Sequence, residues 1–372
     1  MKSTPYAKRQ EKLTRILVDE GLDALALNPG PDLTYLTGLD FHLMERPVLG
    51  IFIPHQQPFF ILPELEAGKL QNLPYPCRSY LYTEDRSTRA QAFQTAVREA
   101  GIEKGRIGVI PRRLRVLELR HLEQGTSSAD FIDGQSAMSA LRIIKDDQEV
   151  SAMQKAAEIA QRAFLATQSK IKPGITEKEL ASALVSQLLE QGSDPDLPFF
   201  PIVSFGANTA NPHASPTDRI LQDNQLLLVD WGATVDGYHS DITRTFKIGD
   251  VGEEFLHIAT LVKSANQVGR DVVQPGTPCS EIDRRVREII EEGGYGEYFI
   301  HRTGHGLGME AHEEPYIAPD DDTLLEAGMT FTIEPGVYLP GKGGVRIEDD
   351  ILVTEKGCRS FTDLPRALIP PR

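Results

Sequence analysis

The sequence has few cysteines, no long apolar segment and a deficit of positive charge. Cys77, Cys279 and Cys358 are too widely spaced, and odd in number, for a disulfide framework or a C-x-x-C zinc site. No run approaches the roughly 20 apolar residues of a membrane helix, and the polar start MKSTPYAKRQEK is unlike a secretory signal. A net charge of −15 disfavours nucleic acid and anionic membranes, because both require clustered Lys and Arg. We therefore expect a cytoplasmic protein with neither partner.

The length and composition instead predict two globular domains. A chain of 372 residues exceeds the commonest single domain, and 40% hydrophobic residues suffice for a core in each of two. Residues 1 to about 140 alternate helical patterns such as KRQEKLTRILVDEG with short apolar runs, as a compact α/β domain does. These runs are DALAL, VLGIFIP, PFFIL and RIGVI. Asp146 or Asp147 can then cap a long helix towards Ser169, so we predict domains over residues 1–142 and 143–372.

The second domain contains a weak internal repeat. The phrase Lys172-Pro173-Gly174-Ile175-Thr176 before one helical pattern recurs as Gln274-Pro275-Gly276-Thr277 before another. Each following pattern has an apolar face, and Thr176 with Glu179 forms a capping box. A Pro-Gly pair before a capped helix is common by itself, but the pattern favours a duplicated α+β domain.

Two aspartates flank a predicted hairpin in LLLVDWGATVDGYHSDITRTF, residues 226–246. Asp236-Gly237 is typical of a two-residue hairpin turn, which would place residue 230 opposite 243 and 232 opposite 241. Asp230 and Asp241 then share one face as diagonal neighbours, roughly 7–8 Å apart. Either aspartate alone could be a turn residue, but two buried carboxylates on one face are costly unless they have a partner.

Further candidate ligands follow in the last quarter of the chain. His301, His305 and His312 lie in HRTGHGLGMEAHEEP, where closely spaced glycines let the backbone approach a ligand. Glu334 ends the β-branched run in MTFTIEPGVYL, and GGVRIEDDILVTE alternates so that Arg346, Glu348 and Asp350 can share one face. Each glutamate alone could be a solvent-exposed strand residue.

Together these residues suit a pair of hard cations. Asp230, Asp241, His305, Glu334 and Glu348 offer oxygen and nitrogen ligands without thiolate, which favours manganese, with cobalt or zinc also possible. Two divalent ions would balance the four carboxylate charges. A water bridging the ions would become a nucleophile at neutral pH, so the set predicts a two-metal hydrolase.

These motifs resemble those of the pita-bread metallopeptidases, in particular the Xaa-Pro group of prolidase and aminopeptidase P. The family's metal ligands are an Asp at the end of a strand and one residue in each of the motifs G-Y-x-x-D-x-T-R-T-F, H-x-x-G-H-G-x-G, I-E-P-G and R-x-E-D. The matching positions in this sequence are Asp230, Asp241, His305, Glu334 and Glu348. The resemblance implies an α+β catalytic domain of two related halves with the metals between them. It also implies a smaller N-terminal α/β domain and a homodimer.

The resemblance also implies roles for residues around the metals. Glu334 would be both ligand and general base, while His213 and His312 would contact substrate and assist proton transfer. The residues expected to face or support the substrate are His301, Tyr338 and Arg346, although Arg346 could instead be a structural ion pair for the carboxylates.

The resemblance leaves the substrate length open. The implied substrate is a small proline-containing peptide, and the chain length is closer to bacterial prolidases than to the longer aminopeptidases P. However, some prolidases have arginine in H-E-x-P-R, where it can hold the carboxylate of a dipeptide, and this sequence has Tyr316 at that position. We expect a Xaa-Pro dipeptidase, with Xaa-Pro aminopeptidase as the alternative. A creatinase-like hydrolase and a non-catalytic binding protein are less favoured, because all five ligand positions are intact.

Overall fold

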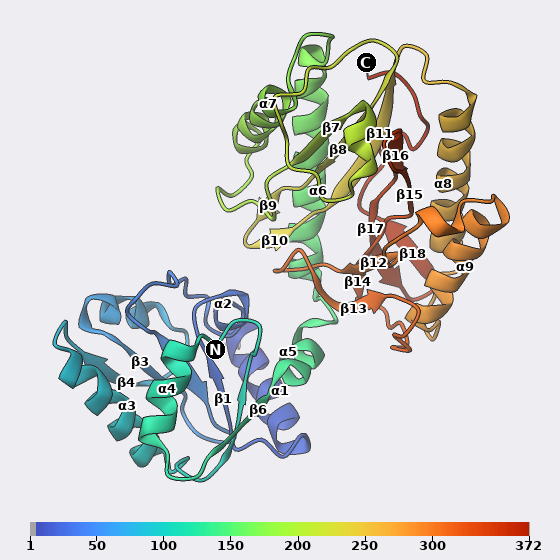
Figure 1. The fold of residues 1–372 in the computed structure, drawn as a ribbon. Coiled ribbons are helices and arrows are strands. Elements are labelled where there is room, and N and C mark those ends of the chain that lie inside the picture. Colours follow the sequence, from blue (N-terminus) through green and yellow to red (C-terminus); the bar gives the residue numbers. More distant parts are fainter. Residues whose placement is uncertain (1–4, 372) are drawn as a thin grey trace. The chain divides into compact units, whose positions relative to one another are not determined.

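The computed structural model describes residues 5–371, and the chain divides into two compact units, Met1–Arg142 and Ile143–Arg372 (Figure 1). The first four residues of the polar N-terminal segment, on which the expectation of no signal sequence partly depends, lie outside the described residues. Within residues 5–371, no helix is both long and apolar enough to cross a membrane.

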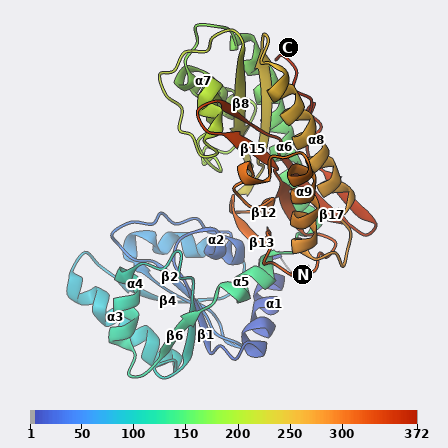
Figure 2. The same ribbon diagram turned by 45° about the vertical axis from the view of Figure 1, so that its right-hand side comes forward.

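The first unit is a six-stranded mixed sheet between two layers of helices. The strands are β1 Ala24–Leu27, β2 Leu49–Phe52, β3 Phe59–Pro63, β4 Arg78–Tyr82, β5 Arg106–Val109 and β6 Asp130–Asp133, in the order β4-β3-β2-β1-β5-β6. The helices are α1 Pro5–Asp19, α2 Pro31–Thr37, α3 Arg86–Ala100, α4 Val116–Gly125 and α5 Gln135–Arg142, with a 3-10 helix at Glu64–Asn72. Helices α3 and α4 cover one face of the sheet, and α1, α2 and α5 lie on the other (Figures 1 and 2).

The four apolar runs predicted as strands are β1, β2, β3 and β5, and the first predicted helix is α1. Strands β4 and β6 were not predicted, because they are the two edges of the sheet. The side chains of β4 alternate between half-buried and exposed up to Tyr82, and β6 has only two half-buried apolar residues between two exposed aspartates. Neither strand therefore shows a long apolar run.

The second unit begins with a helix pair on a three-stranded antiparallel sheet. The helices are α6 Asp147–Thr167 and α7 Glu177–Glu190, and the strands are β7 Ile202–Phe205, β8 Gln225–Trp231 and β11 Ile242–Ile248, in the order β11-β8-β7. Both predicted helix starts are confirmed, since Asp146 and Thr176 each form a capping box with a glutamate three residues later. Phe164 of α6 stacks on Trp231 of β8, which closes the core between the helices and this sheet.

The rest of the unit repeats this plan with a larger sheet. The helices are α8 Glu253–Asp271 and α9 Cys279–Glu292. The five-stranded sheet has the order β13-β12-β14-β17-β18, with β12 Gly304–Gly306, β13 Glu313–Ile317, β14 Thr330–Ile333, β17 Asp349–Thr354 and β18 Gly357–Ser360. Two ribbons complete it: β9 Thr234–Val235 with β10 Tyr238–His239, and β15 Gly336–Leu339 with β16 Gly343–Arg346. Short 3-10 helices occur at Gln168–Lys170, Gly206–Ala210 and Gly296–Tyr298.

The sequence repeat corresponds to a repeated backbone contact. Gly174 N–H donates to Leu221 O at 3.0 Å, and Gly276 N–H donates to Leu325 O at 2.8 Å. The reciprocal bonds, Leu221 N–H to Ile175 O and Leu325 N–H to Thr277 O, are both 2.9 Å. Each Pro-Gly phrase thus pairs with a later segment of its own half, which confirms the predicted duplication.

Candidate metal centre

The predicted hairpin is present and places both aspartates as expected. Asp230 on β8 pairs with Thr243 on β11, and Asp236 and Gly237 form the two-residue turn with φ of 52° and 77°. One step further along this register brings Gly232 opposite Asp241. A side chain at position 232 is excluded, since its Cβ would lie 1.9 Å from Ser240 O.

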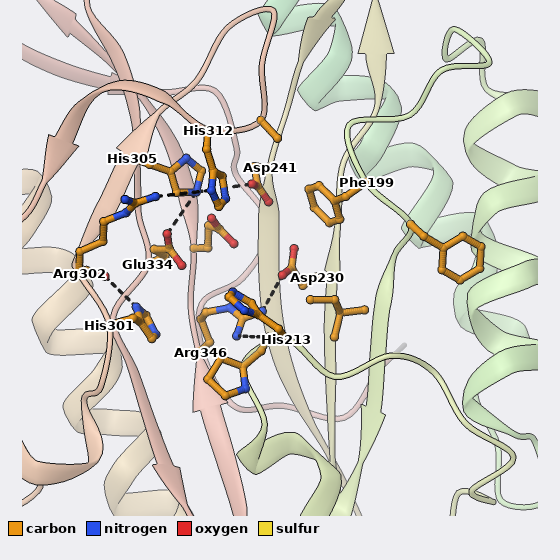
Figure 3. Close-up of a pocket in the computed structure, with 15 residues that line it drawn as sticks. Phe199, His213, Asp230, Asp241, His301, Arg302, His305, His312, Glu334 and Arg346 are labelled. Atoms are coloured by element: carbon orange, nitrogen blue, oxygen red, sulfur yellow. Dashed lines mark hydrogen bonds and ion pairs between the residues drawn. The ribbon is translucent and has the colours of Figure 1, made fainter. Parts of the chain in front are cut away.

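All five predicted ligands line one cavity of about 650 Å³ (Figure 3). Ligand atoms of Asp241, His305 and Glu348 all lie within 4.8 Å of one another. His305 Nε2 is 3.8 Å from Asp241 Oδ2 and 3.3 Å from Glu334 Oε1. The side chains come from both halves of the unit, because β8 and the start of β11 supply the aspartates and the five-stranded sheet and its adjoining turns supply the rest.

Neighbouring hydrogen bonds fix the orientation of these groups. His305 Nδ1 lies 3.1 Å from Gly306 O, so Nδ1–H donates to this carbonyl and Nε2 faces the carboxylates of Asp241 and Glu334. The Thr243 hydroxyl donates to Glu348 Oε2 at 2.5 Å, and Thr332 Oγ1 lies 3.3 Å from Glu334 Oε1. These polar contacts hold His305, Glu334 and Glu348 in place.

The electrostatics of the cavity require positive charge. Burial, and then the charges of Glu348 and Asp230, raise the pKa of Asp241 well above its usual value. Burial followed by the charges of Glu334 and Asp230 does the same to the pKa of Glu348. Asp230 Oδ1 and Asp241 Oδ1 are buried and accept no hydrogen bond. Unpartnered carboxylate oxygens beside an imidazole nitrogen are what hard divalent cations bind, so the residues present fit two such ions.

The guanidinium of Arg346 contacts this cluster directly. Its Nη2 donates to Asp230 Oδ2 at 2.6 Å, its Nε to Thr243 Oγ1 at 3.0 Å and its Nη1 to the Tyr338 hydroxyl at 3.0 Å. Tyr338 does not line the cavity; it lies behind the wall and donates to His301 Nε2 at 2.9 Å. Arg346 therefore lines the cavity, as expected for a residue that faces the substrate, and also forms a structural ion pair with Asp230.

The other three predicted histidines also line the cavity. The ring of His312 lies 3.9 Å from that of His305, and burial, followed by the charges of His305 and Arg302, lowers the pKa of His312 to about 4. His301 is fixed by the Tyr338 hydroxyl, whereas His213 is exposed on a loop. That loop is anchored by the buried Glu177, which accepts from Thr217 N–H at 2.9 Å.

Several functional neighbours were missed by the sequence analysis. Asp350 accepts from the Asp241 backbone N–H at 3.0 Å, and Thr243 bridges Glu348 and Arg346. Thr243 lies on β11 two residues after Asp241, which directly precedes this strand, so the period-2 rule could have found it. The remaining cavity residues carry no motif of their own and come together only in the fold: Phe199, Phe200, Ile202, Pro212, Arg302 and Ala311.

Comparison with known proteins agrees with this geometry. The profile of metallopeptidase family M24 matches residues 151–355, more than half of the chain. The chain belongs to metallopeptidase family M24. The profile of the Creatinase/Prolidase N-terminal domain matches residues 9–144 of this M24 metallopeptidase.

Solved structures show the same two-part architecture over nearly the whole chain. A dipeptidase from Pyrococcus horikoshii is 38% identical, with a TM-score of 0.92 over 97% of this chain and 99% of its own. A prolidase from Thermococcus sibiricus is 34% identical, with a TM-score of 0.94 over 99% and 100%. A Xaa-Pro dipeptidase from Bacillus anthracis is 32% identical, with a TM-score of 0.88 over 98% and 99%. The expected α+β pita-bread domain with a smaller N-terminal domain, and the expected metallopeptidase class, are both confirmed.

Proposed function

We propose that this M24 metallopeptidase hydrolyses Xaa-Pro dipeptides with two divalent cations, manganese being the ion that its oxygen-rich ligand set favours. The observation that carries the proposal is the buried cluster of Asp230, Asp241, His305, Glu334 and Glu348, in which two carboxylate oxygens have no partner. The dipeptidase and prolidase names of its similar structures support the substrate class.

The five residues of the cluster would hold the cations. When bound, divalent cations supply Lewis-acid polarisation of the scissile carbonyl and lower the pKa of water. Burial alone would raise the pKa of Glu334, but the hydrogen bond and charge of His305 lower it to about 2. Glu334 is therefore ionised at neutral pH and can accept a proton as general base.

The histidines are placed to act on the substrate side. His312 is neutral at pH 7 because of its lowered pKa, so it can donate or accept a hydrogen bond at the leaving nitrogen. His213 faces the same cavity from the opposite loop. Phe199, Ile202 and Pro212 provide an apolar wall that suits a pyrrolidine ring.

A Xaa-Pro aminopeptidase is the second candidate, and one observation favours it. A further cavity of about 470 Å³ shares Phe200, Ile202 and His213 with the first. This space could receive residues beyond the proline of a longer peptide. Comparing turnover of Ala-Pro with Ala-Pro-Gly at one controlled manganese concentration separates the two functions.

The metal requirement is tested by chelation. We expect the apo-protein to be inactive and manganese to restore cleavage of Ala-Pro. Full activity after exhaustive chelation, with no metal found by elemental analysis, would refute the two-metal proposal.

Two variants test the assignment of residues. Asp241→Ala removes a carboxylate whose Oδ1 is buried and unpartnered, so both metal content and turnover should be lost. His213→Ala removes an exposed side chain at the rim and should keep two ions per chain while turnover falls by roughly 10²-fold, as for loss of a proton-transfer group. Retention of two ions by Asp241→Ala would contradict its role as ligand.

Three proposals concern the chain as a whole. We propose that residues 1–142 and 143–372 are its domains, that it works as a homodimer, and that it is cytoplasmic. The first is supported by the division after Arg142, the second by the resemblance to prolidases, and the third by the scarcity of cysteine. Light scattering at micromolar concentration measures the second directly.

A further inference from the structure

A second guanidinium, that of Arg302, lines the cavity beside that of Arg346. Among residues 5–371, no carboxylate lies within ion-pair distance of Arg302, whereas Arg346 is paired with Asp230 at 2.6 Å. Arginine is weakly hydrated and presents a planar fork that matches a carboxylate, so an unpaired guanidinium in a substrate cavity is a candidate anion site.

The backbone of Arg302 is held by a chain of hydrogen bonds that begins at the metal centre. Arg346, which contacts Asp230, donates to the Tyr338 hydroxyl, and Tyr338 donates to His301 Nε2 at 2.9 Å. His301 Nδ1–H then donates to Arg302 O at 2.7 Å. This chain fixes the position of residue 302 relative to Asp230.

Helix α9 holds the same segment from the other side. Asp283 accepts from the Thr303 N–H at 3.0 Å, and Arg287 donates to His301 O at 3.0 Å. The Arg302 guanidinium itself stacks over the Tyr316 ring, with 4.3 Å between the guanidinium carbon and the ring centroid. The charge is therefore pre-positioned before a ligand arrives, which reduces the entropy lost on binding.

The guanidinium also lies close to the reaction centre. Arg302 Nη2 is 3.5 Å from His312 Nδ1, and the His312 ring is 3.9 Å from that of the metal ligand His305 (Figure 3). An anion bound to Arg302 would thus be separated from the metal ligand His305 by a single side chain, that of His312. Each further residue would move a peptide's C-terminus by about 3.3–3.6 Å, which exceeds the tolerance of a hydrogen bond.

We propose that Arg302 binds the C-terminal carboxylate of a substrate that ends one residue after the scissile bond, and so makes this enzyme selective for dipeptides. The inference rests on the proposed function and assigns its length specificity to one residue. Tyr316 occupies the position at which some prolidases have a carboxylate-binding arginine. In this structure its ring instead supports the guanidinium of Arg302.

The test compares Ala-Pro with Ala-Pro-amide, which differ in charge at the proposed contact. The wild type with manganese should prefer the free acid, mainly through a lower KM. Arg302→Gln should raise KM for Ala-Pro about 10- to 100-fold more than KM for Ala-Pro-amide, which corresponds to the loss of a charge-assisted hydrogen bond. Arg302→Lys, which keeps the charge but not the fork, should retain part of the preference.

Arg285→Gln is the matched control. It removes the same charge from an exposed position on α9, where Arg285 pairs with Glu288 at 3.5 Å. Its acid-to-amide ratio should equal that of the wild type, which separates a local contact from the general field of the protein. Inhibition constants for L-proline and L-prolinamide give a second measurement, and Arg302→Gln should weaken only the former.

The results distinguish failure of the Arg302 contact from failure of the proposed Xaa-Pro dipeptidase activity. If no Xaa-Pro probe is cleaved by the metal-loaded wild type, the proposed function fails and the inference fails with it. If Ala-Pro is cleaved but the acid-to-amide ratio is near one, or survives in Arg302→Gln, the inference alone is overturned. A general loss of stability does not imitate the expected result, because both probes need the same metals and the same histidines.

Discussion

Replacing Thr243 with valine should weaken metal binding although Thr243 is not itself a proposed ligand. Its hydroxyl donates to Glu348 Oε2 at 2.5 Å and accepts from Arg346 Nε at 3.0 Å. Valine has nearly the same shape and is also β-branched, so strand β11 should keep its conformation. The substitution therefore removes two polar contacts of the site with little other change.

The size of the effect follows from what Glu348 loses. A hydrogen bond to a charged group contributes about 1.5–3 kcal/mol, and roughly 1.4 kcal/mol corresponds to a tenfold change in an equilibrium constant. Loss of the contact to Glu348 should thus raise the Kd for manganese about 10- to 100-fold, the range found when groups that orient metal ligands are removed.

Titration calorimetry of manganese into the chelated protein measures this change directly. Thr260→Val on the exposed face of α8 is the control, because its hydroxyl bonds only a helix carbonyl, Leu256 O at 2.9 Å. A Kd of Thr243→Val for manganese within about twofold of the wild-type value would refute the reasoning, because it corresponds to a change of less than about 0.5 kcal/mol in binding free energy.

Two further predictions concern buried charges outside the ligand set. Asp349 is fully buried and accepts hydrogen bonds from two arginine side chains, at 2.7 and 2.6 Å. Asp349→Asn should cost about 3–5 kcal/mol in denaturant unfolding, since it leaves buried guanidinium charge uncompensated. Exposed Asp363→Asn should cost almost nothing, and equal losses in both would contradict the argument. Lys145 pairs with Glu313 at 2.7 Å, and both are buried. Lys145→Met should cost a similar amount, and adding Glu313→Gln should recover most of it; a double variant as unstable as the single one would show that the ion pair is not the cause.

The catalytic unit was largely predictable because its signals are local. The Asp236-Gly237 turn sets the register of the hairpin, so the shared face of Asp230 and Asp241 follows from counting residues. The capped helices after Asp146 and Thr176 are likewise marked by side chains within one turn.

What could not be predicted depends on contacts between distant segments. Arg302 becomes a candidate anion site only because the fold places Tyr316 beneath it and no carboxylate within reach among the described residues. The contact of Asp350 with the Asp241 backbone joins residues of different halves. The edge strands β4 and β6 have polar positions that resemble loops, and only their neighbours make them strands.

The duplication of the second unit has a consequence for how it responds to its cofactor. Asp230 and Asp241 come from the first half, and His305, Glu334 and Glu348 come from the second, so each half carries only part of a coordination sphere. Ions bound by all five proposed ligands would link the two halves, and their binding free energy would stabilise the contact between the halves. The two halves should therefore separate transiently more often in the apo-protein. Faster amide hydrogen exchange at the bridge between Thr243 and Glu348 would reveal this opening.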